Sequence, residues 1–182
     1  RALAMRSGWS LPGESPSYDG PNDFDSWDRC ITRGMPSSMM PYRYNGGVRI
    51  MQTPGYVILD LEMVHETRIV PVDGRPALGT VFKHYMGESR GHWEGNTLIV
   101  DVRNNNAKAR LARTGEFLSD QVRIEERYIF DNARQRFNYV ARIDDPAVYT
   151  QAWTATIPMR RYTENDAFDG WHYEAEVANT PD

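Results

Sequence analysis

The residues best suited to acid–base chemistry gather between Glu62 and Arg90. A carboxylate beside an imidazole raises its basicity and fixes its tautomer, so Glu62 is expected to orient His65 as a general base. The permanent charges of Arg68 and Arg90 are expected to stabilise developing negative charge. Arg68 or Arg75 is expected to anchor a carboxylate or phenolate oxygen, with Arg75 assigned to substrate binding. The alternative is a lattice of surface salt bridges around a turn, and both interpretations stay open at this point.

Glu126 is a candidate because of its place in an alternating run. The run over residues 120–130 puts Val122, Ile124, Glu126, Tyr128 and Phe130 on one face. A carboxylate on an apolar face needs a partner or a proton. Glu126 is therefore expected to act as an interior acid or base or to anchor a ligand. The alternative is a buried ion pair with an arginine such as Arg142 or Arg90.

Aromatic side chains make up 12% of the chain, including five Trp. Trp and Tyr line both cores and ligand cavities. We expect four of them to shape the pocket and contact the substrate, namely Tyr85, Trp93, Tyr128 and Trp153.

Other kinds of site find little support. The four histidines form no i, i+2 or i, i+4 pair, so no metal site is predicted, although convergence in the tertiary structure stays open. There is no Gly-x-Ser-x-Gly nucleophile motif, no Walker A loop and no dinucleotide fingerprint, so we expect no cofactor. Cys30 is the only cysteine, which excludes an internal disulfide and a Cys-rich zinc module.

Composition limits the class of protein. The chain has 182 residues, 40% of them hydrophobic and 25% charged, which is enough for one folded domain with a core. No apolar run approaches the ~18 residues of a membrane span. The net charge of −4 argues against a nucleic-acid partner. The chain begins at Arg1, as expected if a targeting peptide has been removed or the sequence trimmed.

Strand patterns dominate the chain after residue 47. Residues 1–46 are rich in Pro and predict an irregular arm packed on the body, with a short helix near 24–29. A second helix is predicted within 76–86, and a hairpin is predicted across Gly95 and Asn96. Strands are predicted over 48–52, 56–63, 67–72, 92–94, 97–103, 120–130, 137–143, 149–159 and 171–177.

These strands, joined by hairpin-length connections, predict a mainly β fold. We expect residues 47–182 to form one antiparallel up-and-down β-barrel domain, with a sandwich as the alternative. A cone-shaped α+β fold would need amphipathic helices that the Pro-rich arm does not supply. An eight-stranded barrel is wide enough to hold one small ligand.

Five ordered motifs resemble a large, mostly uncharacterised family of bacterial proteins, many of which carry an export signal. They are DRCITRG at 28–34, RIVPVDGRP at 68–76, MGESRGHWEGNTLIVD at 86–101, ERY at 126–128 and DDPAVYTQAWT at 144–154. The resemblance implies a calycin-like barrel, as in lipocalins, and a periplasmic or secreted location, with a cytoplasmic one left open. The family's C-terminal Cys-His-Glu motif keeps only His172 and Glu174 here.

The function expected from these features is a cofactor-independent acid–base enzyme of the lyase, isomerase or cyclase type. Its substrate would be a hydrophobic small molecule, aromatic or terpenoid, held in the barrel. The alternative is a non-catalytic, lipocalin-like carrier in which the ionic cluster is structural. A third alternative is an exported interaction module. An interior completely filled with side chains would favour this alternative over the other two. An exposed edge strand or the arm could support a homodimer.

Overall fold

The computed structural model describes residues 19–42, 44–111 and 116–162. Within them the regular structure is almost entirely β, and the helices are short 3-10 turns. The strands are β1 (Val48–Thr53), β2 (Tyr56–Leu61), β3 (Glu66–Pro71), β4 (Glu88–Glu94), β5 (Thr97–Arg103), β6 (Arg123–Asp131), β7 (Arg136–Asp144) and β8 (Trp153–Arg160). The 3-10 turns are Pro21–Asp23, Trp27–Arg29, Ser37–Met39, Met63–His65 and Asn132–Arg134.

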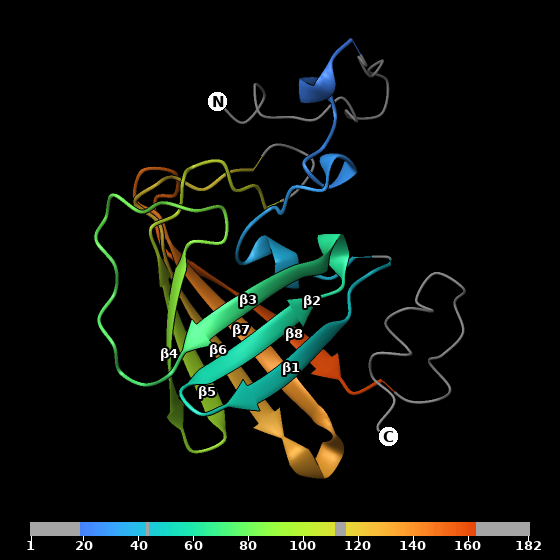
Figure 1. The fold of residues 1–182 in the computed structure, drawn as a ribbon, viewed down its shortest axis with the longest axis vertical. Coiled ribbons are helices and arrows are strands. Elements are labelled where there is room, and N and C mark those ends of the chain that lie inside the picture. The colour runs from blue at the N-terminus through green and yellow to red at the C-terminus, as the bar shows by residue number, and fades with distance from the viewer. Residues whose placement is uncertain (1–18, 43, 112–115, 163–182) are drawn as a thin grey trace.

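The strands form two antiparallel sheets. β1, β2 and β3 make one sheet, β4 to β8 make the other, and within each sheet every strand pairs with the next in the chain. Figure 1 shows the smaller sheet lying across the larger one, with the N-terminal arm at one end. The mainly β, antiparallel prediction is confirmed. No ladder joins β3 to β4 or β1 to β8 among these strands, so they are two sheets rather than a closed barrel.

Turn residues end the strands where the sequence indicates. Gly55, between β1 and β2, has φ +81°, and Gly95, between β4 and β5, has φ +59°. Both values lie in the left-handed region that glycine adopts at little cost, and the hairpin predicted across Gly95 and Asn96 is confirmed. The helix predicted within residues 76–86 is wrong. This segment is a loop that carries only an isolated bridge from His84 to Asn105.

Alternation along the strands separates the core from the solvent. On β6, Ile124, Glu126 and Tyr128 are buried, while Arg123 and Glu125 are exposed. The residues predicted to face inward on β7 and β8 also belong to the core or pack against it, except Ala155. We call this surface of the two sheets the inner face. Alternation predicted it correctly because one side of each sheet faces the other sheet.

The sheets come closest where β4 crosses β3. A Cβ built on Gly91 of β4 would lie 2.8 Å from Cγ1 of Val70 and 3.1 Å from Cγ1 of Val72. Glycine fits there because the backbone of β4 lies against the side chains of Val70, on β3, and Val72, just after β3. The opposite edges of the two sheets, formed by β1 and β8, also approach each other. A Cβ built on Gly47, which precedes β1, would lie 3.4 Å from the ring of Tyr162, which follows β8.

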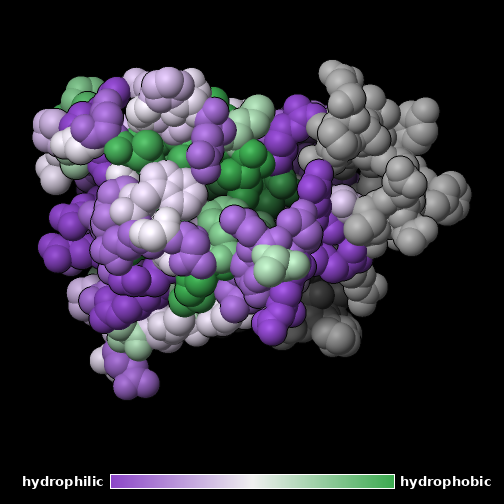
Figure 2. Space-filling model, turned by 90° about the horizontal axis from the view of Figure 1, so that it is seen from below, coloured by the Kyte–Doolittle hydropathy of each residue, from purple (hydrophilic) through white to green (hydrophobic). Residues whose placement is uncertain are grey.

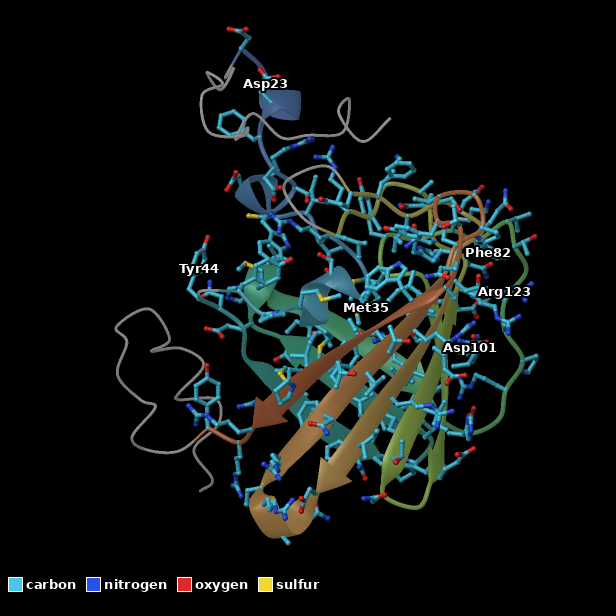
Figure 3. All side chains as sticks on the ribbon, turned by 180° about the vertical axis from the view of Figure 1, so that it is seen from behind. Asp23, Met35, Tyr44, Phe82, Asp101 and Arg123 are labelled. Atoms are coloured by element: carbon cyan, nitrogen blue, oxygen red, sulfur yellow. The ribbon has the colours of Figure 1, made fainter. Side chains whose placement is uncertain are left out.

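The described part of the arm contributes to the core. Met35 and Met39 are buried and belong to the same hydrophobic cluster as the two sheets, and Figure 3 labels Met35 where the arm meets the strands. The helix predicted near residues 24–29 is reduced to the 3-10 turn Trp27–Arg29. The strand predicted over residues 171–177 lies outside the described residues. None of the described helices is long and apolar enough to cross a membrane.

Candidate functional site

A buried ion pair stands at the centre of the inner face. Nη2 of Arg68, on β3, lies 2.6 Å from Oε2 of Glu126, on β6, and the two side chains are 3% and 0% exposed. Nε of Arg68 also donates to Oγ of Ser89, on β4, at 2.9 Å. Arg68 therefore ties the smaller sheet to two strands of the larger one.

Two tyrosines complete this cluster. The Tyr139 hydroxyl donates to Oε1 of Glu126 at 2.6 Å. The Tyr128 hydroxyl accepts from Nη1 of Arg68 at 3.3 Å, and none of the residues that the structure describes accepts its proton. We call Arg68, Ser89, Glu126, Tyr128 and Tyr139 the polar cluster. Arg68 polarises the Tyr128 hydroxyl, whose proton is left without an acceptor among these residues.

Burial and the ion pair control protonation in the polar cluster. Burial, assisted by the negative charge of Glu126, raises the pKa of Tyr128 and Tyr139 far above the ordinary range. Burial works against the charge on Arg68, but the charge and hydrogen bond of Glu126, together with the two tyrosines, outweigh it and raise the pKa of the guanidinium. Both tyrosines stay neutral phenols at physiological pH, so they can donate hydrogen bonds but cannot serve as bases.

Strand register explains why these side chains meet. Tyr128 is paired with Leu98 on β5 and Tyr139 on β7, and Trp93 on β4 is paired with Leu98. One inward row therefore crosses the larger sheet from Trp93 to Tyr139. In the neighbouring row Glu126 lies beside the small residue Ala141 on β7.

Aromatic rings line the inner face from the polar cluster to the β6–β7 hairpin. The Tyr139 and Tyr128 ring centres are 5.1 Å apart, and those of Tyr128 and Phe137 are 6.0 Å apart. The series continues from Phe137 to Phe130 at 5.3 Å and from Phe130 to Trp93 at 5.9 Å. Trp93 is 37% exposed, so this aromatic row runs from the core to the surface.

A groove of about 510 Å³ lies between the free edges of β1 and β8. Its apolar lining includes Ile50 and Met159, which pack against the core, and its charged lining includes Arg49. Across the smaller sheet, Ile50 of the groove pairs with Leu59, and Leu59 pairs with Arg68 of the polar cluster. Only Leu59 therefore lies between the groove and the polar cluster in this row of the sheet. Seen from below in Figure 2, hydrophobic side chains show in the middle of the molecule, flanked by hydrophilic ones.

The predicted base and its orienting carboxylate lie at the start of β3. His65 is exposed, and its backbone N–H donates to the Glu62 carbonyl at 3.3 Å. Oε2 of Glu62 accepts the backbone N–H of Gly47 at 2.8 Å, so Glu62 supports one rim of the groove. The role of His65 as a base stays a prediction.

The other two predicted arginines lie outside the polar cluster. Arg75 is exposed, where it pairs with Asp73 and donates to the Tyr56 hydroxyl at 2.7 Å. Arg90 forms an ion pair with Glu88 and donates to the Pro76 carbonyl at 3.1 Å. Both hold the loop after β3.

The remaining aromatic candidates are divided between two places. Trp153 lies on the inner face, 5.7 Å from the Tyr149 ring, and its buried Nε1 has no hydrogen-bond partner among the described residues. Tyr85 instead lines a separate hollow beside the arm. Of the ten predicted site residues, only Arg68, Glu126 and Tyr128 belong to the polar cluster.

Sequence reasoning missed two members of the polar cluster and the partner of Glu126. Arg142 and Arg90 were the expected partners, but Arg142 lies near Asp144 and Arg90 near Glu88. Tyr139 could have been found, because alternation already places it on the inner face of β7. Ser89 could not, because no pattern around it indicates a buried hydroxyl.

Within the described residues, no group of three or more His, Cys, Asp or Glu side chains is placed to hold a metal ion. In comparisons with known proteins, no family model, curated protein or solved structure matches the chain. The resemblance to the bacterial family therefore stays a prediction from the motifs.

Proposed function

We propose that this protein binds a small hydrophobic molecule, with an aromatic or terpenoid body and one hydrogen-bond-accepting oxygen, between its two sheets. The observation that carries the proposal is the polar cluster at the inner end of the aromatic row. Apolar surface with a few convergent polar groups is what small-molecule sites use. Here the apolar part is the aromatic row and the polar part is Arg68 with Tyr128.

The proposal includes a calycin-like closure of the strands around the ligand. Two facts support it: β3 presses on β4 at Gly91, and the ends of β1 and β8 approach at Gly47 and Tyr162. A ligand in the groove would replace the missing contacts between β1 and β8. The ligand would thus become part of the core, as in small ligand-holding barrels.

Hydrogen bonding would select the ligand. The Tyr128 proton is available, and the guanidinium that polarises it is held by Glu126 and Ser89. A carbonyl, ether or hydroxyl oxygen on an aromatic body would accept this proton. A ligand without such an oxygen would leave the donor buried and unpaired, which costs about 1–3 kcal/mol.

A fluorescent aromatic ketone, 6-propionyl-2-dimethylaminonaphthalene, tests the proposal against its carbonyl-free parent, 2-dimethylaminonaphthalene. We expect saturable binding of the ketone at one site per chain. Tyr128→Phe should weaken ketone binding by about tenfold and leave the parent unaffected. The matched control is Tyr44→Phe, at an exposed tyrosine.

A second pair of variants tests the location of the site. Met159→Arg puts a charge in the groove, whereas Thr156→Arg puts the same charge on the exposed face of the same strand. The first should abolish ketone binding and the second should not. Equal binding by wild type, Tyr128→Phe and Met159→Arg would refute the proposal.

A second candidate function is the cofactor-independent lyase or isomerase, and the Tyr128 hydroxyl favours it. A neutral phenol beside a guanidinium is suited to stabilise an enolate oxygen formed by proton abstraction. Arg68 would supply the charge and Glu126 would hold Arg68 in place. His65 remains the proposed base, with Glu62 beside it in the chain.

Exchange of the hydrogens next to the carbonyl of the same ketone, followed by NMR in D₂O, separates the enzyme from the carrier. An enzyme should accelerate this exchange, and His65→Ala and Glu126→Gln should each slow it by ~10²-fold. If the ketone binds but its hydrogens exchange no faster than in buffer, the carrier function is supported and the enzyme function is refuted. Circular dichroism of each variant checks that it has folded.

A further inference from the structure

A second hollow lies between the arm and the loop after β5, away from the inner face. It has a volume of about 220 Å³. Its polar lining comes from Ser26 and Arg29 of the arm and from Lys108 and Arg110 of the loop. No acidic residue lines it, although the whole chain has a net charge of −4.

The cations of the loop are available to a ligand. No ion pair of Lys108 or Arg110 occurs among the described side chains, whereas the only other lysine, Lys83, pairs with Asp120 at 2.6 Å. Oδ1 of the nearby Asp25 carboxylate pairs with Arg33, 2.7 Å away, whereas its buried Oδ2 has no hydrogen-bond partner among the described residues.

Ser26 supplies an independent observation. Its Oγ is buried and has no hydrogen-bond partner among the described residues, although buried hydroxyls are normally paired. An oxygen of a ligand in the hollow would satisfy this hydroxyl. A hydroxyl beside a lysine and two arginines is a donor set suited to the oxygens of a phosphate.

The walls of the hollow are fixed by the fold. The Arg110 backbone N–H donates to the Arg33 carbonyl at 3.0 Å, which joins the loop to the arm. The side chains of Asn105 and Asn106 each accept a backbone N–H two residues later, both at 3.0 Å. These turns set the backbone that carries Lys108, so little ordering is needed before a ligand binds.

We propose that this hollow is a binding site for a small aromatic phosphate monoester. Lys108, Arg110 and Arg29 would neutralise the phosphate, and Ser26 would donate to one of its oxygens. Phe24 and Tyr85, which also line the hollow, would contact the aromatic part. The site is independent of the proposed function between the sheets.

Titration calorimetry at low ionic strength tests the site, with phenyl phosphate as the probe and inorganic phosphate for comparison. We expect phenyl phosphate to bind at one site per chain and more tightly than inorganic phosphate. Lys108→Gln and Arg110→Gln should each weaken binding by about tenfold or more. Ser26→Ala should weaken it without changing the charge, and added salt should weaken it in the wild type.

Lys83→Gln and Arg123→Gln are the matched controls, because each removes one positive charge outside the hollow. Both should bind phenyl phosphate like the wild type. Absence of saturable binding, or equal losses in the control and site variants, would overturn the proposal. Equal affinity for phenyl phosphate and inorganic phosphate would overturn the aromatic part of it.

Discussion

Arg68 and Glu126, 58 residues apart in the chain, form an ion pair of 2.6 Å between the two sheets. The same guanidinium also donates hydrogen bonds to Ser89 on β4 and Tyr128 on β6, and Glu126 accepts one from Tyr139 on β7. The hydrogen-bond network around the pair therefore joins β3 of the smaller sheet to three strands of the larger one. Removing charges from water is costly, and the added hydrogen bonds offset that cost. The pair thus fixes how the two sheets face each other.

Breaking this pair should destabilise the fold strongly. Arg68→Met leaves Glu126 buried and unpaired, and Glu126→Leu leaves Arg68 in the same state, so each should lower the free energy of unfolding by about 3–5 kcal/mol. The double variant should lose less than either single one, because it leaves no isolated charge. Urea denaturation measures all three.

The neighbouring pair Glu125–Arg127, on the exposed face of the same strand, is the matched control. Its N–O distance is 2.8 Å and both side chains are more than two-fifths exposed. Glu125→Gln should change the free energy of unfolding by less than about 1 kcal/mol. Similar losses for the exposed and buried pairs would contradict the assigned role of Arg68.

The raised pKa values of Tyr128 and Tyr139 predict alkaline sensitivity. In the folded protein these phenols keep their protons well above pH 10, whereas in the unfolded chain they lose them near pH 10. Their contribution to stability is therefore complete below about pH 10 and is lost as the pH rises further. Each should add about 1.4 kcal/mol per pH unit to the decline.

Denaturation between pH 9 and about 11.5, compared in wild type and Tyr128→Phe, checks this effect. The variant should be less stable at neutral pH but should lose stability less steeply above pH 10. Tyr44→Phe, at an exposed tyrosine, should keep the steepness of the wild type. An unchanged slope in Tyr128→Phe would show that this phenol titrates normally.

A larger residue at Gly91 should destabilise the fold. A methyl group there would meet Val70 and Val72 at the point where β4 presses on β3. Gly91→Ala should therefore cost about 1–3 kcal/mol through overpacking. Gly46→Ala is the control, because a Cβ at Gly46 meets nothing within 4 Å. Thermal unfolding of the two variants gives the comparison, and equal midpoints would contradict the close contact.

The arm should contribute to the stability of the whole fold. Met35 is 0% exposed and belongs to the core of the sheets, so Met35→Ala should lower the free energy of unfolding by about 2–5 kcal/mol. Met51→Ala, at a 38% exposed methionine of β1, should change it by less than about 0.5 kcal/mol. A small effect of Met35→Ala would indicate that the arm can detach from the sheets without lowering the free energy of unfolding.

Local patterns were sufficient for the strands and their inner faces. Alternation placed Glu126 and Tyr128 on the buried face of β6, because side chains on a strand point to opposite sides in turn. Turn residues located the β4–β5 hairpin. The loop at 76–86 was mistaken for a helix, because a low density of β-branched residues marks the absence of a strand and not the presence of a helix.

What the sequence alone determined is therefore which side chains face inward, including a carboxylate that needs a partner. The choice of Arg68 over Arg90 and Arg142 was decided only by the tertiary structure, because β3 and β6 belong to different sheets and no pairing register relates them. The same holds for the exposed position of His65 and for the hollow that joins Ser26 to Lys108. Contacts between segments far apart in the chain depend on how the sheets pack, which strand periodicity does not encode.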